Sequence, residues 1–243
     1  MAKLVIDSST LKAIADAIRE KLGTTEKINP YLMDDRIRSI DTSGVTIKQH
    51  LDLTENASRL FYNYSMETLP NYVTYDLTEN VTDVSGMFWN CVNLNDVPLL
   101  NTENATDMNY MFYNCKSLTK IPQINTNKAT NISSMFSSCW NLETIDITSM
   151  DGITSAYNAG YIASGCFSLK KFIIRNMTKV PFIGASPFSY CYHFLGTVNS
   201  KYNPDGLKDG AIYVPDAYVD QLKAADGWNT YADLIKPLSE LYE

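Results

Sequence analysis

The five cysteines are the side chains in this sequence with the clearest capacity for metal or redox chemistry. They stand at positions 91, 115, 139, 166 and 191, so that successive cysteines are 24, 24, 27 and 25 residues apart. Zinc sites and redox pairs usually need two cysteines separated by about two to four residues, and no such pair occurs. The two histidines, His50 and His193, are far apart in the sequence. The spacing therefore indicates a repeated structural position at which small thiol side chains are buried.

Enzyme motifs are not recognisable elsewhere in the chain. Asp and Glu residues are scattered, and no nucleophile elbow, phosphate-binding loop or zinc-protease motif occurs. Two isolated histidines offer no pair for acid–base catalysis. We therefore expect no catalytic residue, no metal site and no cofactor, and we predict that the protein is not an enzyme.

The cysteines belong to a repeat that covers residues 60 to about 194. Three segments of 24 residues align without gaps and begin at Met87, Met111 and Met135. Looser copies contain Cys166 and Cys191, and an earlier copy from Leu60 has Tyr64 in place of the cysteine. One repeat buries too few apolar side chains to offset the conformational entropy lost on folding. Neighbouring repeats are therefore expected to stack.

Within a repeat, the apolar pattern predicts short extended segments joined by polar turns. In the copy that contains Cys115, Leu118 to Ile124 is predicted as a strand, Asn125 to Lys128 as a turn, and Ala129 to Ile132 as a second extended piece. Such units predict a solenoid over residues 45–198.

The N-terminal residues 1–44 have a different pattern and are predicted to form a small helical attachment module. Residues 9–22 have an amphipathic helix signature that ends at Gly23, and a second short helix begins near Pro30. Two such helices make a poor independent core, so we expect them to dock on another chain or to self-associate. The residues expected to make this attachment are Leu11, Ile14, Ile18, Leu22, Met33 and Ile37.

The C-terminal residues 199–243 are predicted to form an α/β cap that covers the exposed end of the stack. Ala211 to Val214 is predicted as a strand and Tyr218 to Ala225 as a helix. Trp228 to Ile235 is predicted as further helical turns, with Trp228, Tyr231 and Ile235 on one face.

Composition and charge limit the possible partners. The net charge of −7 and the absence of a Lys/Arg-rich run argue against a nucleic-acid partner. No apolar stretch resembles a signal peptide or a membrane span, so we expect no export signal and no membrane insertion.

Four aromatic residues next to the recurring turn are the candidate binding residues. Tyr62, Trp89 and Tyr113, with Trp140 nearby, could stack on sugars or contact a protein partner. The alternative is that these rings only pad the convex side of the solenoid, and the sequence leaves both interpretations open.

The Met-Phe-x-x-Cys-x-x-Leu motif of three successive repeats resembles the BspA-like leucine-rich repeats of bacterial and phage proteins. This resemblance implies a leucine-rich-repeat solenoid, mainly of short β-strands and turns. The segment LKAIADAIREKLGTTEKINPYLMDDRIRSI is similar to the opening of tail and baseplate-associated proteins of Firmicute phages. The ending IYVPDAYVDQLKAADGWNTYADLIKPLSEL resembles a C-terminal segment that accompanies such repeats.

The resemblance implies a bacteriophage tail or baseplate protein that binds the host surface through its repeats. Its expected partners are other tail or baseplate proteins at the N-terminal helices, a host glycan or protein at the repeats, and further copies of itself in the particle. Its expected location is the virion, after synthesis in the cytoplasm of the bacterial host. Two alternatives remain: a purely structural tail connector without host contact, and a bacterial surface adhesin.

Overall fold

The computed structural model describes residues 49–50, 56–65, 73–74, 80–199 and 201–242. The chain divides into two units, one of residues 1–52 and 70–76 and one of residues 53–69 and 77–243. In the first unit, β1 (Gln49–His50) pairs in parallel with β2 (Val73–Thr74). The predicted N-terminal helices and their six attachment residues lie outside the described residues.

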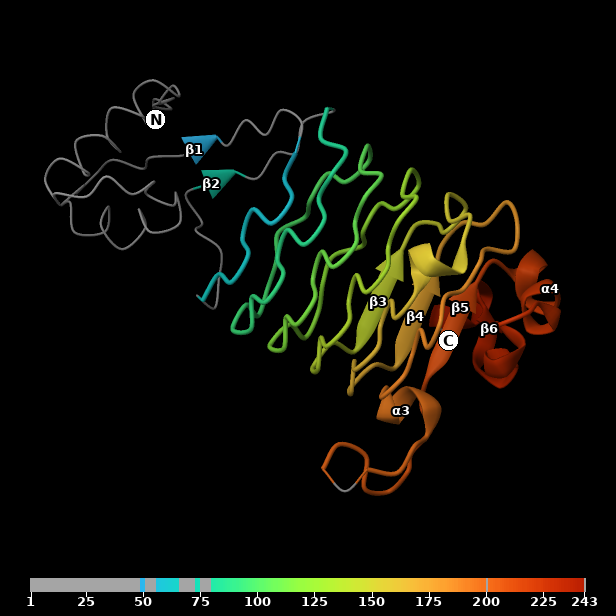
Figure 1. Cartoon of the computed structure of the whole chain (residues 1–243). Helices are drawn as coiled ribbons and strands as arrows, with labels where there is room; N and C mark the ends of the chain where they lie inside the picture. Colours follow the sequence, from blue (N-terminus) through green and yellow to red (C-terminus); the bar gives the residue numbers. More distant parts are fainter. Residues whose placement is uncertain (1–48, 51–55, 66–72, 75–79, 200, 243) are drawn as a thin grey trace, which may run out of the picture. The chain divides into compact units, whose positions relative to one another are not determined.

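The second unit contains a four-stranded parallel sheet in the order β3-β4-β5-β6 (Figure 1). Its strands are β3 (Thr144–Ile147), β4 (Lys171–Ile174), β5 (Ala211–Val214) and β6 (Ile235–Pro237). Ile145 lies opposite Phe172, Phe172 opposite Ile212, and Ile212 opposite Ile235. All four side chains are buried, so one apolar row crosses the whole sheet.

Helices in the described part of this unit are few and short. They are η2 (Ala156–Ala159), α3 (Tyr192–Leu195), η3 (Asp216–Tyr218), α4 (Val219–Ala224), η4 (Asn229–Leu234) and η5 (Leu238–Tyr242). Leu238 and Leu241 of η5 pack against Ile173 and Tyr213 of the sheet. The hydroxyl of Tyr242 accepts a hydrogen bond of 2.8 Å from Arg175, which connects η5 to the residue that follows β4.

Before the sheet, successive repeats stack through their turns, which follow one another as parallel loops in Figure 1. The backbone N–H of Phe88 donates to the carbonyl of Met111, and that of Phe112 donates to the carbonyl of Met135, each at 2.8 Å. The rings of Phe88 and Phe112 stack with centroids 5.3 Å apart. Equivalent residues of neighbouring repeats therefore lie directly beside each other.

The predicted fold class, a leucine-rich-repeat solenoid mainly of short β-strands and turns with an α/β cap, is wrong. In the described part of the second unit, regular strands are confined to one small open parallel sheet, and few helices accompany it. The predicted strand from Leu118 to Ile124 pairs only at Ile124, in an isolated bridge with Ile147. In the C-terminal residues, β5 and β6 continue the sheet that β3 and β4 begin.

Prolines explain why the early repeats lack strands. Pro98 and Pro122 each stand seven residues after the cysteine of their repeat. Proline has no backbone N–H and cannot donate to a central strand. The next two repeats have Asp146 and Ile173 at this position, and both lie within strands, β3 and β4.

Two local predictions for the C-terminal region are confirmed and one is wrong. The predicted strand from Ala211 to Val214 is β5, and α4 lies within the predicted helix from Tyr218 to Ala225. However, Ile235 begins β6 and does not share a helical face with Trp228. The Trp228 indole is instead held by a 2.8 Å hydrogen bond from its Nε1 to the carbonyl of Pro181.

Candidate binding surface

A tight turn in front of each cysteine determines which side chains of the repeat face outward. In the repeat that contains Cys115, Tyr110 and Asn114 have positive φ angles of 54° and 62°. The corresponding residues of the other repeats, five before and one before the cysteine position, have positive φ as well. Met111 is buried, whereas Tyr113 is partly exposed. The turn therefore presents the side chain two residues before the cysteine at the surface.

The cysteines themselves lie in the core and do not offer a reactive site. All five are free and buried. Each thiol donates a hydrogen bond of 3.0 Å to a carbonyl oxygen of the preceding repeat, as Cys115 does to Phe88 and Cys139 to Phe112. Burial raises the pKa of the Cys115, Cys139 and Cys191 thiols well above the ordinary value of 9.0. A protonated, inaccessible thiol is a poor nucleophile and a poor metal ligand.

The first group of surface rings is the N-terminal aromatic patch. It consists of Arg59, Tyr62, Trp89, Tyr110 and Tyr113. The Trp89 ring stacks on Tyr110 at a centroid distance of 4.9 Å, and it meets Tyr62 and Tyr113 edge to face at 5.7 and 5.5 Å. The Arg59 guanidinium lies 5.3 Å from the Trp89 ring centroid. Tyr62 is 46% exposed, so the patch is open to a partner.

The second group is the C-terminal aromatic patch. It consists of Lys116, Trp140, Phe167, Tyr192, Lys201 and Tyr202. Phe167 contacts the rings of Trp140, Tyr192 and Tyr202 at centroid distances of 5.3, 5.4 and 4.2 Å. Lys116 and Lys201 carry the positive charges of this patch. All four rings are partly exposed.

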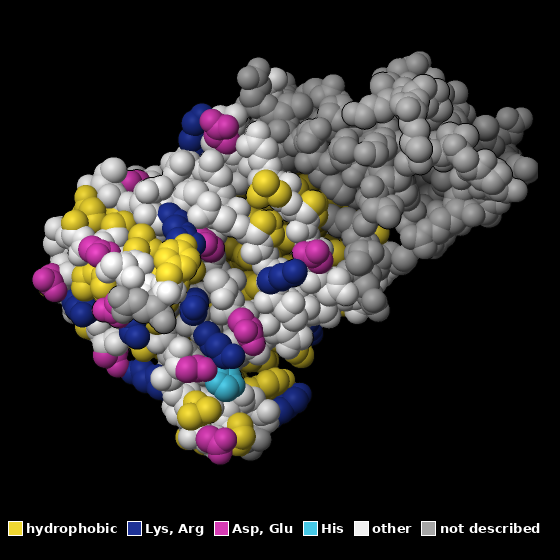
Figure 2. Space-filling model, turned by 180° about the vertical axis from the view of Figure 1, so that it is seen from behind, with side chains coloured by type: hydrophobic (Ala, Val, Ile, Leu, Met, Phe, Trp, Pro, Cys, Tyr) yellow, Lys and Arg dark blue, Asp and Glu magenta, His cyan; other side chains and the backbone are white. Residues whose placement is uncertain are grey.

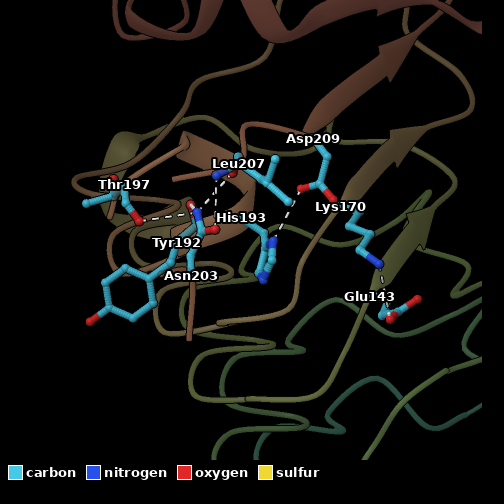
Figure 3. A network of polar contacts seen from close by, with 8 residues as sticks. All are labelled: Glu143, Lys170, Tyr192, His193, Thr197, Asn203, Leu207 and Asp209. Carbon is cyan, nitrogen blue, oxygen red and sulfur yellow. Dashed lines mark hydrogen bonds and ion pairs between the residues drawn. The ribbon is translucent and has the colours of Figure 1, made fainter. Parts of the chain in front are cut away.

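A loop after α3 brings Tyr202 to this patch, and the side chain of the next residue, Asn203, is drawn in Figure 3. The buried Asn203 side chain holds the loop by donating to the carbonyls of Tyr192, Thr197 and Leu207, and it accepts a bond from the N–H of Leu207. Such complete pairing is what a buried amide requires. Beside the loop, Nδ1 of His193 lies 3.7 Å from Asp209 and forms no hydrogen bond among the described residues.

The structure brings together three of the four predicted binding residues. Tyr62, Trp89 and Tyr113 occupy the same position in successive repeats, two residues before the cysteine position, and they touch one another in sequence order. Trp140 is separate, because it stands one residue after its cysteine and belongs to the C-terminal aromatic patch.

Several residues of the two patches are not among the binding residues predicted from the sequence. Counting from the cysteines would have found Phe167 and Tyr192, which occupy the same position as Trp140 in the next two repeats. Tyr110 and Tyr202 could not be found by counting from the cysteines. Tyr202 lies on the loop after α3, and Tyr110 joins its patch because the turn packs its ring against Trp89. The attachment residues at the N-terminus are outside the described residues.

Charges of both signs are mixed on one face of the molecule. On the face shown in Figure 2, Lys and Arg side chains alternate with Asp and Glu side chains, and no large basic area forms. In the described ranges, no cluster of three or more His, Cys, Asp and Glu side chains is arranged to hold a metal ion. Nor does any helix in this part of the chain have the length and apolar character needed to cross a membrane.

Comparison with known proteins gives a match to a protein family. A search of the curated proteins finds no relative of this chain. Residues 55–173 match the family described as "Mycoplasma protein of unknown function, DUF285". This family is in the BspA-like repeat group, so residues 55–173, which include the whole N-terminal aromatic patch, are similar to that group.

Proposed function

We propose that the protein is a bacteriophage tail or baseplate component that binds the host cell surface through its repeats. The observation that carries the proposal is the N-terminal aromatic patch, in which residues from three repeats form one partly exposed cluster with an arginine. Surface rings that keep a polar handle are typical of recognition sites. The similarity of residues 11–40 to phage tail proteins supports the location in a virion.

In this proposal the N-terminal residues and the repeats bind different partners. The N-terminal residues 1–44, which are predicted to be helical, bind other tail or baseplate proteins, and several copies assemble in the particle. The repeats face outward and contact a glycan or a protein of the host. Trp89 is central, because it contacts Tyr62, Tyr110 and Tyr113. Removing its ring would therefore disrupt the whole patch.

The test measures binding of the labelled full chain to intact Firmicute host cells and to their isolated cell wall. We expect the unaltered protein to bind and the double variant Trp89→Ala/Tyr113→Ala to bind at least about tenfold more weakly, because truncation of a central aromatic residue of an interface commonly costs about 1 to 2 kcal/mol or more. Circular dichroism and the thermal midpoint would establish that the variant is folded.

A matched control is Tyr157→Ala/Phe182→Ala. These two aromatic residues are 91% and 56% exposed and lie outside both patches, so their removal should leave binding unchanged. Equal binding by the Trp89→Ala/Tyr113→Ala variant and the unaltered protein would remove the patch from the contact. If the unaltered protein bound neither cells nor wall, the purely structural connector would be the better interpretation.

A further inference from the structure

The C-terminal aromatic patch repeats one position in three successive turns. Trp140, Phe167 and Tyr192 each follow a cysteine directly, and their rings lie next to one another along the stack. Tyr202 joins them from outside the repeat and packs 4.2 Å from Phe167. The loop that carries Tyr202 is fixed by the fully paired Asn203 amide (Figure 3), so this extra ring is placed rigidly.

Positive charge is added at both ends of this row. The Nζ atom of Lys116 lies 4.0 Å from the Trp140 ring centroid, and the Nζ atom of Lys201 lies 4.7 Å from that of Tyr202. Neither ammonium group forms an ion pair with a described residue. In a chain of net charge −7, two unpaired ammonium groups on one aromatic row favour an acidic ligand.

The orientation of the rings favours the same kind of ligand. Trp140 stacks on Phe167 and Tyr192 stacks on Tyr202, and the two ammonium groups lie over the rings of Trp140 and Tyr202. These contacts cover ring faces, so the ring edges are available to a ligand. Aromatic edges carry partial positive charge, whereas the faces are negative. A carboxylate or phosphate group is therefore attracted by the edges as well as by the lysines.

The backbone around the patch argues against an extended peptide. Peptides that lie along a sheet bind through unpaired backbone groups of an edge strand. Here the carbonyl of Trp140 accepts from the N–H of Ser168 at 3.1 Å, and that of Glu143 accepts from the N–H of Lys170 at 2.9 Å. The phenol hydroxyls of Tyr192 and Tyr202 have no hydrogen-bond partner among the described residues, and they can pair with sugar hydroxyls.

We propose that the C-terminal aromatic patch binds an acidic saccharide chain, with Lys116 and Lys201 contacting its carboxylate or phosphate groups. The inference deepens the proposed function, on which it rests for the biological source of the glycan. It assigns a ligand class to residues that the N-terminal aromatic patch does not include.

Oligogalacturonate and its methyl ester form a suitable pair of probes, because they differ mainly in charge. We expect the full chain to bind oligogalacturonate in calorimetry, to bind the ester at least about tenfold more weakly, and to lose affinity between about 50 and 500 mM salt. Lys116→Gln/Lys201→Gln should weaken binding of the acidic form about tenfold, and Tyr202→Phe about threefold.

The matched control is Lys179→Gln/Lys236→Gln, which removes the same charge from two exposed lysines outside both patches. Equal losses in the control and in Lys116→Gln/Lys201→Gln would overturn the proposal, as would equal affinity for the ester. If polyglutamate bound as tightly as oligogalacturonate, the ligand would be an acidic peptide and the proposal would be wrong. If polyphosphate bound and oligogalacturonate did not, the ligand would be a phosphate polymer and the proposal would also be wrong. Binding of uronate without binding to host cells would contradict the proposed function and leave this inference standing.

Discussion

At the scale of single residues, asparagine has a special place in the turns. Asn63, Asn90 and Asn114 stand immediately before the cysteine position of three successive repeats, with φ angles of 60°, 64° and 62°. The side chain of Asn90 donates to that of Asn63 at 2.6 Å, and Asn114 donates to Asn90. Asparagine tolerates the left-handed region better than most residues, and here its amide also links neighbouring repeats.

Substitutions of Asn114 separate these two contributions. Asn114→Ala loses the hydrogen bond and replaces asparagine by a residue that tolerates the left-handed region less well, so the free energy of unfolding should fall by about 2 kcal/mol. Asn114→Gly loses the same hydrogen bond, but glycine adopts the left-handed conformation freely, so the free energy of unfolding should fall by only about 1 kcal/mol. Urea denaturation of both variants measures the difference. Equal costs for Ala and Gly would show that the backbone conformation contributes nothing.

Residue types and spacing predicted the core better than the surface. The cysteine spacing correctly predicted five buried, structurally equivalent side chains, since the interior of a stack repeats strictly. The aromatic surface does not repeat in this way. Rings occupy the position two before the cysteine up to Tyr113 and the position one after it from Trp140 onward. A surface position needs no fixed residue type, so periodicity alone could not show that the two sets form separate patches.

At the scale of elements, the apolar pattern of the sequence did not predict where strands form or how the loop after α3 is held. The apolar pattern of Leu118 to Ile124 resembles that of β3, yet a strand forms only where proline is absent. The loop after α3 carries no apolar period, because its conformation depends on one buried side chain, Asn203, which is 1% exposed. Hydrogen bonds to a single amide leave no signature in a sequence pattern.

The variant Asn203→Asp tests whether this amide holds the loop. A carboxylate would face the three carbonyls that now accept from the amide, so we expect a loss of about 3 kcal/mol in unfolding free energy. Displacement of Tyr202 should also reduce binding to oligogalacturonate. Asn199→Asp is the matched control, since the Asn199 side chain only accepts hydrogen bonds, from the N–H groups of Lys201 and Tyr202. Similar losses in the two variants would contradict the assigned role of Asn203.

At the scale of the whole molecule, the second unit joins two kinds of stacking along one direction. Turn-to-turn hydrogen bonds connect the early repeats, and the same succession continues into β3, β4, β5 and β6. The thiols run through this stack, and each bonds to the repeat before it. Because unfolding of the stack would expose these thiols together, we expect them to ionise when the whole unit unfolds and not through local openings.

Raising the pH should therefore destabilise the protein. The pKa of Cys115, Cys139 and Cys191 is higher in the folded state than the ordinary 9.0, so these thiols ionise first in the unfolded chain. Stability is retained below the unfolded pKa and decreases as the pH rises from there toward the folded pKa. Between about pH 9 and 10, each thiol should lower the free energy of unfolding by about 1 kcal/mol. Urea denaturation at several pH values measures this decrease, and the variant Cys139→Ala should lose about one third of the part due to these three thiols. An unchanged pH dependence in Cys139→Ala would show that the Cys139 thiol is already ionisable within the fold, contrary to its burial.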